Sequence, residues 1–112
     1  MSAEDRAFLG WLHTQPCTVA GTPGSPCFGR ITVHHLMRYG ERRNHRRAMP
    51  LCLGHHERDW GRDSFERLRW RGFERRFGID IEQVIAGLNA QFVGLGDTCL
   101  KSFGMKIEGS AI

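Results

Sequence analysis

The chain has 112 residues, of which 40% are apolar, and it carries a formal net charge of +4 with four cysteines and six histidines. This length predicts one small domain with a modest core, which a bound metal or a partner subunit would stabilise. No stretch approaches the roughly 18 consecutive apolar residues of a membrane span, and the opening MSAEDRAFLG lacks the basic and apolar regions of a signal peptide. We therefore expect a cytoplasmic protein with no membrane partner.

The first predicted element is a short helix, SAEDRAFLGWLHTQ, which Ser2 can cap. Phe8, Trp11 and Leu12 share one face of this helix, so its expected role is packing. His13 lies at its end, where exposure or a favourable helix-terminus position is expected in preference to metal binding.

A loop rich in Gly, Pro, Ser and Thr then joins Cys17 to Cys27. The following segment, RITVHHLM, predicts a short β-strand because β-branched residues alternate around Ile31. Successive side chains of a strand point to opposite faces, so His34 and His35 are expected to face different surroundings. A polar, Arg-rich connection, RYGERRNHRRA, follows the strand.

Three helices are predicted after this connection. MPLCLGHHERDWG is expected to enter a helix at Pro50 and to end at Gly61. Asp63 begins the next helix through a D-x-x-E capping box, and Gly78 ends it as a left-handed cap. Asp80 caps the last predicted helix, IEQVIAGLNAQF.

These elements give one expected domain over residues 1–93. Its core, over residues 16–61, follows the first helix, and two helices over residues 63–92 complete it. Residues 94–112 have no clear period and are expected to be a partly disordered or partner-dependent tail. Cys99, within this tail, has no predicted role.

Arginine dominates the positive charge. Fourteen of the sixteen basic residues are Arg, and twelve of these fall within residues 38–76. Arginine holds phosphate with a planar, bidentate fork that lysine lacks, which favours a nucleic-acid partner. The alternative is a solvated helical surface, because six acids share the same span: Glu41, Glu57, Asp59, Asp63, Glu66 and Glu74.

Cys17, Cys27, Cys52 and His55 form a candidate zinc set. Thiolate and imidazole are the ligands that tetrahedral Zn²⁺ prefers, and Cys52-x-x-His55 places two of them one helical turn apart. The Cys17 to Cys27 spacing is long, but the Gly and Pro content of the loop lets it fold back. The alternative is that these two cysteines are ordinary buried residues. The four cysteines could also form two disulfides in a secreted scaffold, but nothing in the sequence points to secretion. If His55 binds zinc, His56 points about 100° further round the helix and is free for another site.

The order HHL, then a polar residue, then PLCxxHH resembles the HNH nucleases, also called ββα-metal or His-Me finger endonucleases, in their zinc-stapled form. The resemblance is to the phage and prophage branch related to the recombination enhancement function (Ref) nuclease. It spans residues 8–92 and is sharpest in RITVHHLMRYG and MPLCLGHH, with a GID-containing segment, FERRFGIDIEQV, behind them. It implies an α+β, treble-clef-like ββα-metal core with flanking helices, and a phage or prophage role in DNA processing or recombination.

The resemblance also implies roles for the histidines. His35 would be the general base that deprotonates the attacking water, since an imidazole titrates near neutral pH. His34 and His56 would hold a catalytic divalent ion, Mg²⁺ or a similar metal. His45 falls where the family has Asn or Asp to orient the base, with Asn44 beside it as a possible substitute. The zinc ligands implied are Cys17, Cys27, Cys52 and His55.

One position departs from the family pattern. In many proteins of that family, a further metal ligand lies four residues after the position of His56. Here that position is occupied by Trp60, which cannot bind metal. Asp59 is the expected replacement, or water fills the position. The arginines expected to hold DNA phosphates are Arg38, Arg42, Arg43, Arg46 and Arg47.

Two rival functions remain. The first is a zinc module that binds DNA without cutting it, in which the changes at His45 and Trp60 mark a lost active site. The second is an interaction protein whose Arg-rich surface docks on a recombinase filament or another acidic partner. The histidines are clustered, since five of the six lie within residues 34–56. Chance does not readily explain this clustering.

Overall fold

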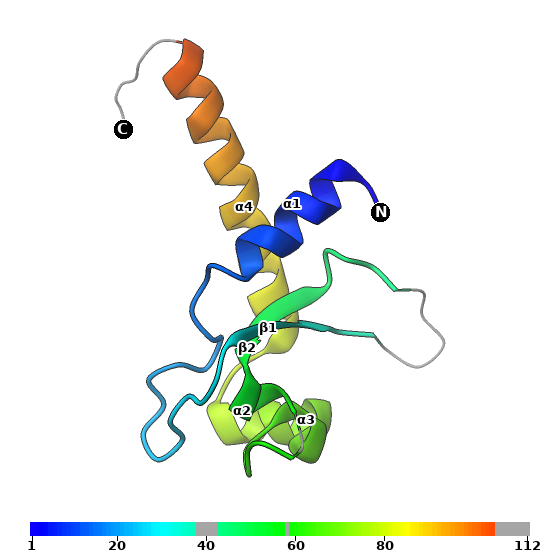
Figure 1. Ribbon diagram of the computed structural model, residues 1–112, viewed down its shortest axis with the longest axis vertical. Coiled ribbons are helices and arrows are strands. Elements are labelled where there is room, and N and C mark those ends of the chain that lie inside the picture. The colour runs from blue at the N-terminus through cyan, green and yellow to red at the C-terminus, as the bar shows by residue number, and fades with distance from the viewer. Residues whose placement is uncertain (38–42, 58, 105–112) are drawn as a thin grey trace.

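The computed structural model describes residues 1–37, 43–57 and 59–104, with residues 96–104 described by their backbone alone. The elements follow in the order α1 (Ala3–Leu12), β1 (Ile31–His35), β2 (Ala48–Cys52), α2 (Leu53–His56), α3 (Phe65–Phe77) and α4 (Ile81–Gly104). Figure 1 shows α2 and α3 at one end of the hairpin and α1 beside α4 at the other. The fold is α+β with flanking helices, as the sequence predicts.

The hairpin pairs β1 with β2 in antiparallel register, from Ile31 opposite Cys52 to His35 opposite Ala48. The predicted strand through the first histidine pair is therefore confirmed. Pro50, which the sequence placed at a helix entry, lies within β2 instead. A two-stranded sheet leaves each strand one outer edge, so the missing N–H of proline is tolerated there. The carbonyl of Pro50 still accepts from the backbone N–H of Thr18, at 2.9 Å.

The helix predicted to run to Gly61 is much shorter. It is α2 alone, and Glu57 after it is extended, with φ −100° and ψ 138°. The chain then folds back so tightly that a Cβ placed on Gly61 would lie 1.8 Å from the carbonyl oxygen of Gly54. Only glycine allows this approach, so position 61 requires glycine in this fold.

Helix α3 begins one residue later than predicted. Ser64 is its N-cap, and its hydroxyl accepts from the backbone N–H of Arg67 at 3.3 Å. Asp63, the predicted cap, instead forms an ion pair with Arg76 at 3.2 Å. Gly78 ends the helix in the left-handed conformation, as predicted, with φ 65° and ψ 36°.

The predicted caps of the other two long helices are confirmed. Ser2 accepts from the backbone N–H of Asp5 at 3.0 Å, and Asp80 accepts from that of Gln83 at 3.2 Å. Helix α4 was expected to end near Phe92, but it continues to Gly104 and projects beyond the rest of the molecule (Figure 1). Glycines within this extension lower helix propensity by only about 1 kcal/mol each, and it contains no proline.

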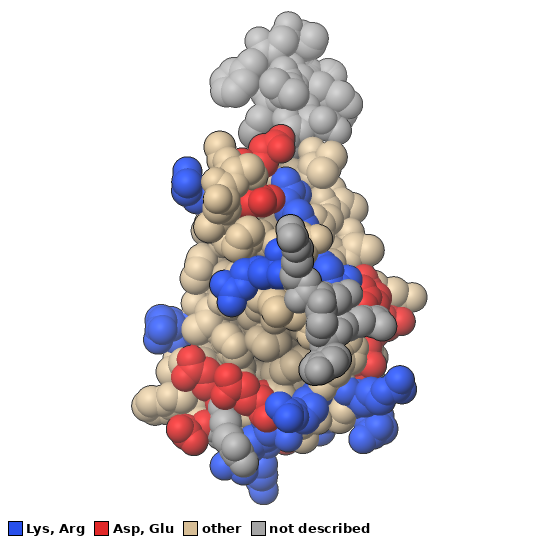
Figure 2. Space-filling view, turned by 90° about the vertical axis from the view of Figure 1, so that its right-hand side faces the viewer, with Lys and Arg blue, Asp and Glu red and all other residues tan. Residues whose placement is uncertain are grey.

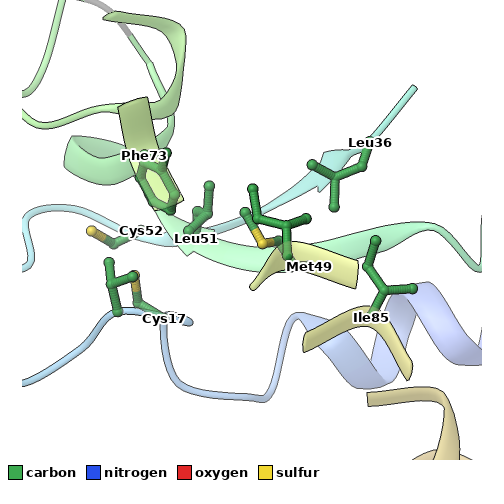
Figure 3. Packing of buried hydrophobic residues seen from close by; sticks show 9 residues of the cluster. Cys17, Leu36, Met49, Leu51, Cys52, Phe73 and Ile85 are labelled. Atoms are coloured by element: carbon green, nitrogen blue, oxygen red, sulfur yellow. The ribbon is translucent and has the colours of Figure 1, made fainter. Parts of the chain in front are cut away.

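The core is built around β2, whose five residues are all buried. Figure 3 shows Met49 and Leu51 of this strand between Leu36, Ile85 and Phe73. Burial on both faces follows from its position, since β2 contacts α1, α2 and α4 as well as β1. In the described part of the chain, none of the helices is long and apolar enough to cross a membrane.

Candidate metal centre and histidine pairs

Three cysteines and one histidine converge beside the hairpin. Cys17 follows α1, Cys27 precedes β1, Cys52 ends β2, and His55 lies in α2. One ligand atom from each lies within 4.8 Å of the others. His55 Nδ1 is 3.1 Å from the sulfur of Cys52, 3.5 Å from that of Cys17 and 3.8 Å from that of Cys27. The predicted set is therefore brought together in space, despite the long spacing of its first two cysteines.

The second ring nitrogen of His55 has a partner that the sequence analysis missed. Ser25 is buried, and its hydroxyl lies 2.8 Å from His55 Nε2. Such a hydrogen bond on the far nitrogen orients a histidine that binds metal through its other nitrogen. Ser25 is one of several small polar residues in a Gly- and Pro-rich loop, so its sequence context gave no specific signal.

The cluster is suited to a cation. Burial raises the pKa of the Cys17 thiol to about 12, and burial also raises the pKa of Cys27. Without a positive charge among them, these thiols stay protonated at neutral pH; a metal ion displaces the protons and makes thiolate ligands. The backbone N–H of Phe28 already donates to the sulfur of Cys52, at 3.4 Å. In donor type and geometry the group could hold a metal ion, and three of its four members are buried while Cys27 is exposed.

His56 faces away from this cluster and meets His34 of β1. His34 Nδ1 lies 3.0 Å from His56 Nε2, and the two rings cross at 70°. His56 Nδ1 lies 2.6 Å from the hydroxyl of Thr32, which donates to the carbonyl of Leu51 at 2.8 Å. Because that hydroxyl proton is already used, His56 Nδ1 must be the donor to Thr32. His56 Nε2 is then left with a lone pair directed toward His34.

Electrostatics keep this pair neutral. Burial, aided by the charges of His56 and His35, lowers the pKa of His34 to about 4. Burial lowers the pKa of His56 as well, and the carboxylates of Glu66 and Glu57 oppose that effect. Both rings are therefore unprotonated near pH 7, which is the state that a metal ligand requires.

The other histidine of the strand forms a second pair. His35 Nε2 lies 3.0 Å from His45 Nδ1, and the rings cross at 77°. Burial lowers the pKa of His35, with further contributions from the charges of Arg43 and His45. The expectation that His34 and His35 face different surroundings is confirmed, because each meets its own histidine partner.

Two of the predicted DNA-binding arginines hold the turn that carries His45. Arg46 donates to Asp5 at 3.2 Å and lies over the ring of Phe8, 4.9 Å from its centroid. Arg47 makes a bidentate pair with Glu82 of α4, with both distances 2.9 Å. Their guanidinium groups are thus engaged within the protein, and they tie this turn to α1 and α4.

Arg43 is exposed, whereas Arg38 and Arg42 lie outside the described residues. Figure 2 shows acidic residues interspersed with the basic ones on the face it presents, with basic side chains gathered toward the α2 and α3 end. The side chain of Cys99 also lies outside the described part of the structure.

Asp59, the expected third ligand beside His56, is exposed. Among the described residues, only the cluster of Cys17, Cys27, Cys52 and His55 assembles three or more potential ligand side chains, so Asp59 does not join His34 and His56. His13 is exposed at the end of α1, as expected.

Comparison with known proteins gives no match to a family model, to a curated protein or to a solved structure. The chain is therefore described by its own structure: the hairpin, the short helix after it and the Cys3His cluster.

Proposed function

We propose that the chain is a metal-dependent endonuclease of the HNH type that cleaves phosphodiester bonds in DNA. The observation that carries this proposal is the pairing of four histidines into two couples, His34 with His56 and His35 with His45, each at 3.0 Å. Adjacent residues of one strand thus present a neutral two-nitrogen site on one side and a histidine-oriented imidazole on the other. That division matches a metal site and a general base.

The Cys3His cluster is proposed to hold a structural Zn²⁺ through Cys17, Cys27, Cys52 and His55. Three sulfurs and one imidazole nitrogen are a common tetrahedral set for this ion, with all four positions taken by protein. Such a closed site stabilises the fold and leaves no position for a substrate. It also joins the loop before β1 to the end of β2 and to α2, which positions the histidine pairs.

His35 is proposed to be the general base. If its Nε2–H donates to His45 Nδ1, its own Nδ1 carries a lone pair that can take the proton of an attacking water. The lowered pKa of His35 keeps the ring neutral before attack. His45 therefore replaces the orienting Asn or Asp of the family, because a neutral imidazole nitrogen accepts one hydrogen bond.

His34 and His56 are proposed to bind the second divalent ion. When bound, that ion would place positive charge beside the scissile phosphate and the leaving oxygen. Two imidazole nitrogens fit a transition-metal ion better than Mg²⁺, which prefers oxygen ligands. Glu66 and Glu57, rather than Asp59, are the acids whose charges act on His56.

DNA is the proposed substrate because of the arginine content and the net charge of +4. Arg43 is exposed next to His45 and can reach a flanking phosphate. Arg46 and Arg47 support binding indirectly, through the turn that they hold.

The test is nicking of supercoiled plasmid by zinc-loaded protein in Mg²⁺, Mn²⁺, Co²⁺ or Ni²⁺. We expect cleavage with at least one transition-metal ion, and we expect His35→Ala to lower the rate by about 100-fold or more with its zinc content unchanged. His13→Ala is the matched control, since it removes an exposed histidine outside both pairs. Retained cleavage by His35→Ala would refute the assignment of the base.

A second candidate function is a zinc module that binds DNA without cutting it, or that docks on a recombinase filament. It is favoured by the two-donor site at His34 and His56, which lacks a third protein ligand among the described residues. Zinc-loaded wild-type protein that binds plasmid but cuts it with none of the four ions would support this alternative. A steep loss of binding with added salt would then favour direct contact with DNA phosphates over a protein partner.

A further inference from the structure

Two large aromatic side chains lie exposed against each other beside the metal cluster. Phe28 and Trp60 are each 53% exposed, and their rings stack with centroids 5.6 Å apart and planes 24° apart. They come from segments far apart in sequence, one after Cys27 and the other after α2. Neither residue has a role in the histidine pairs, and together the two rings form a contiguous exposed apolar surface of the kind that can serve in binding.

The backbone holds this pair in place. The carbonyl of Phe28 accepts from the N–H of Gly54 at 2.9 Å, and the N–H of Phe28 donates to the sulfur of Cys52 at 3.4 Å. On the other side, Gly61 follows Trp60 and packs against Gly54, where a Cβ would lie 1.8 Å from the carbonyl oxygen. The backbone segments that carry both rings are therefore held against α2, so they need little ordering when a ligand binds.

A hollow of about 240 Å³ opens beside the two rings. It is lined at its polar side by Ser25, Arg62 and Asp63. This volume is below the 300–1,000 Å³ or so of sites for drug-sized ligands, so it suits one planar ring system. The surroundings offer an aromatic face for stacking and the exposed guanidinium of Arg62 for the edge of that ring, whereas Ser25 and Asp63 are engaged with His55 and Arg76.

We propose that Phe28 and Trp60 form a stacking site for an unpaired nucleobase of single-stranded DNA. Every base has a π-face that stacks on aromatic side chains, whereas bases in a duplex are already stacked on one another. Arg30 and Arg62 are exposed at the neighbouring positions and supply charge for the sugar-phosphate chain. The inference rests on the proposed nuclease function. It specifies single-stranded DNA as the form of the substrate that binds beside α2, the helix that carries His56.

The test is binding of zinc-loaded protein to fluorescent single strands, measured by anisotropy at one fixed salt concentration. The probes are an oligothymidine and an abasic strand of equal length and charge. We expect Trp60→Ala to weaken oligothymidine binding roughly tenfold, to the level of the abasic strand, and to leave abasic binding unchanged. Trp60→Phe should restore most of the affinity because it keeps an aromatic face.

Val93→Ala is the matched control, since Val93 is 56% exposed on α4 and away from the hollow. Zinc content and circular dichroism establish that Trp60→Ala is folded. Unchanged oligothymidine binding by folded Trp60→Ala, or an equal loss on both strands, overturns the stacking site and leaves a protein partner as the explanation of the exposed rings.

Cleavage separates this inference from the proposed function. If wild-type protein cuts DNA while Trp60→Ala binds oligothymidine as the wild type does, the stacking site fails and the nuclease stands. If Trp60 proves necessary for binding to bases but no ion supports cleavage, the stacking site stands and the nuclease fails.

Discussion

His34 and His56 are 22 residues apart in sequence, yet Nδ1 of the first lies 3.0 Å from Nε2 of the second. The strand brings one of them and the short helix after the hairpin brings the other. Thr32, two residues before His34 on the same face of β1, fixes the second ring through its Nδ1, at 2.6 Å. The orientation of His56 toward His34 thus depends on the hydroxyl of Thr32.

Replacing Thr32 by valine should therefore weaken metal binding at His34 and His56. The change keeps the shape of the side chain but removes the acceptor for His56 Nδ1–H, so the ring is free to adopt its other tautomer. Loss of such an orienting hydrogen bond lowers metal affinity by about 10- to 100-fold. Isothermal titration calorimetry of zinc-loaded protein with Co²⁺ or Ni²⁺ measures this affinity.

Thr18→Val is the control for that substitution, because Thr18 also donates its hydroxyl to a carbonyl, that of Pro50, at 2.8 Å. It should leave affinity for the second ion unchanged. Equal affinities of the wild type and Thr32→Val would remove Thr32 from the site.

Removal of the zinc proposed for the Cys3His cluster should unfold much of the domain. Cys52→Ser replaces a buried ligand at the junction of β2 and α2, and the core of so small a chain is modest. We expect loss of bound zinc and a lower thermal midpoint, measured by metal analysis and circular dichroism. Cys99→Ser should change neither quantity. A Cys52→Ser variant with normal zinc and normal stability would contradict a structural role for the cluster.

The ion pair of Arg47 and Glu82 should hold the turn that carries His45. Glu82→Gln weakens the bidentate contact, and because both side chains are partly exposed the stability cost should be only about 1 kcal/mol or less. The local effect should be larger: faster amide hydrogen exchange at Leu36 and Arg47, whose N–H groups bond to Arg47 and Asn44.

Asp63→Asn weakens the separate ion pair with Arg76 on α3, and it should leave exchange in the turn unchanged. If Glu82→Gln does not alter exchange there either, the turn is held by Arg46 and its partners without this pair.

Stability should fall at acid pH because of His34. Its pKa is about 4 in the folded chain, against the ordinary value of 6.5, and burial is the main cause. Between these pH values the unfolded chain therefore binds a proton that the folded chain does not. The free energy of unfolding is highest above pH 6.5 and falls as the pH is lowered toward 4. The difference amounts to at most about 3 kcal/mol. Urea unfolding at a series of pH values measures it.

His34→Asn should flatten this pH dependence relative to the wild type. Other buried histidines act in the same direction, so the difference between the two proteins reports His34 together with its coupling to His56. Identical slopes between pH 6.5 and 4 would mean that His34 is not held neutral by its surroundings.

Local patterns in the sequence determined which neighbouring side chains diverge and where α1 and α4 begin. The two-residue period of a strand separates His34 from His35, and the turn angle of a helix separates His55 from His56. Ser2 and Asp80 cap helices, and Gly78 ends one, because these residues bond or bend the chain within a few positions. The Cys3His set could also be predicted from the sequence, since few residue types supply the sulfur and imidazole ligands that zinc prefers.

The tertiary structure decided what each of these side chains meets. Ser25 and Thr32 reach their histidines across 30 and 24 residues, and Arg47 reaches Glu82 across 35. Local patterns specify the direction of a side chain relative to its own element, but the partner in that direction depends on how distant segments pack. For the same reason, Pro50 lies in a strand that its local context did not predict, since pairing with β1 and burial on both faces outweigh local preference.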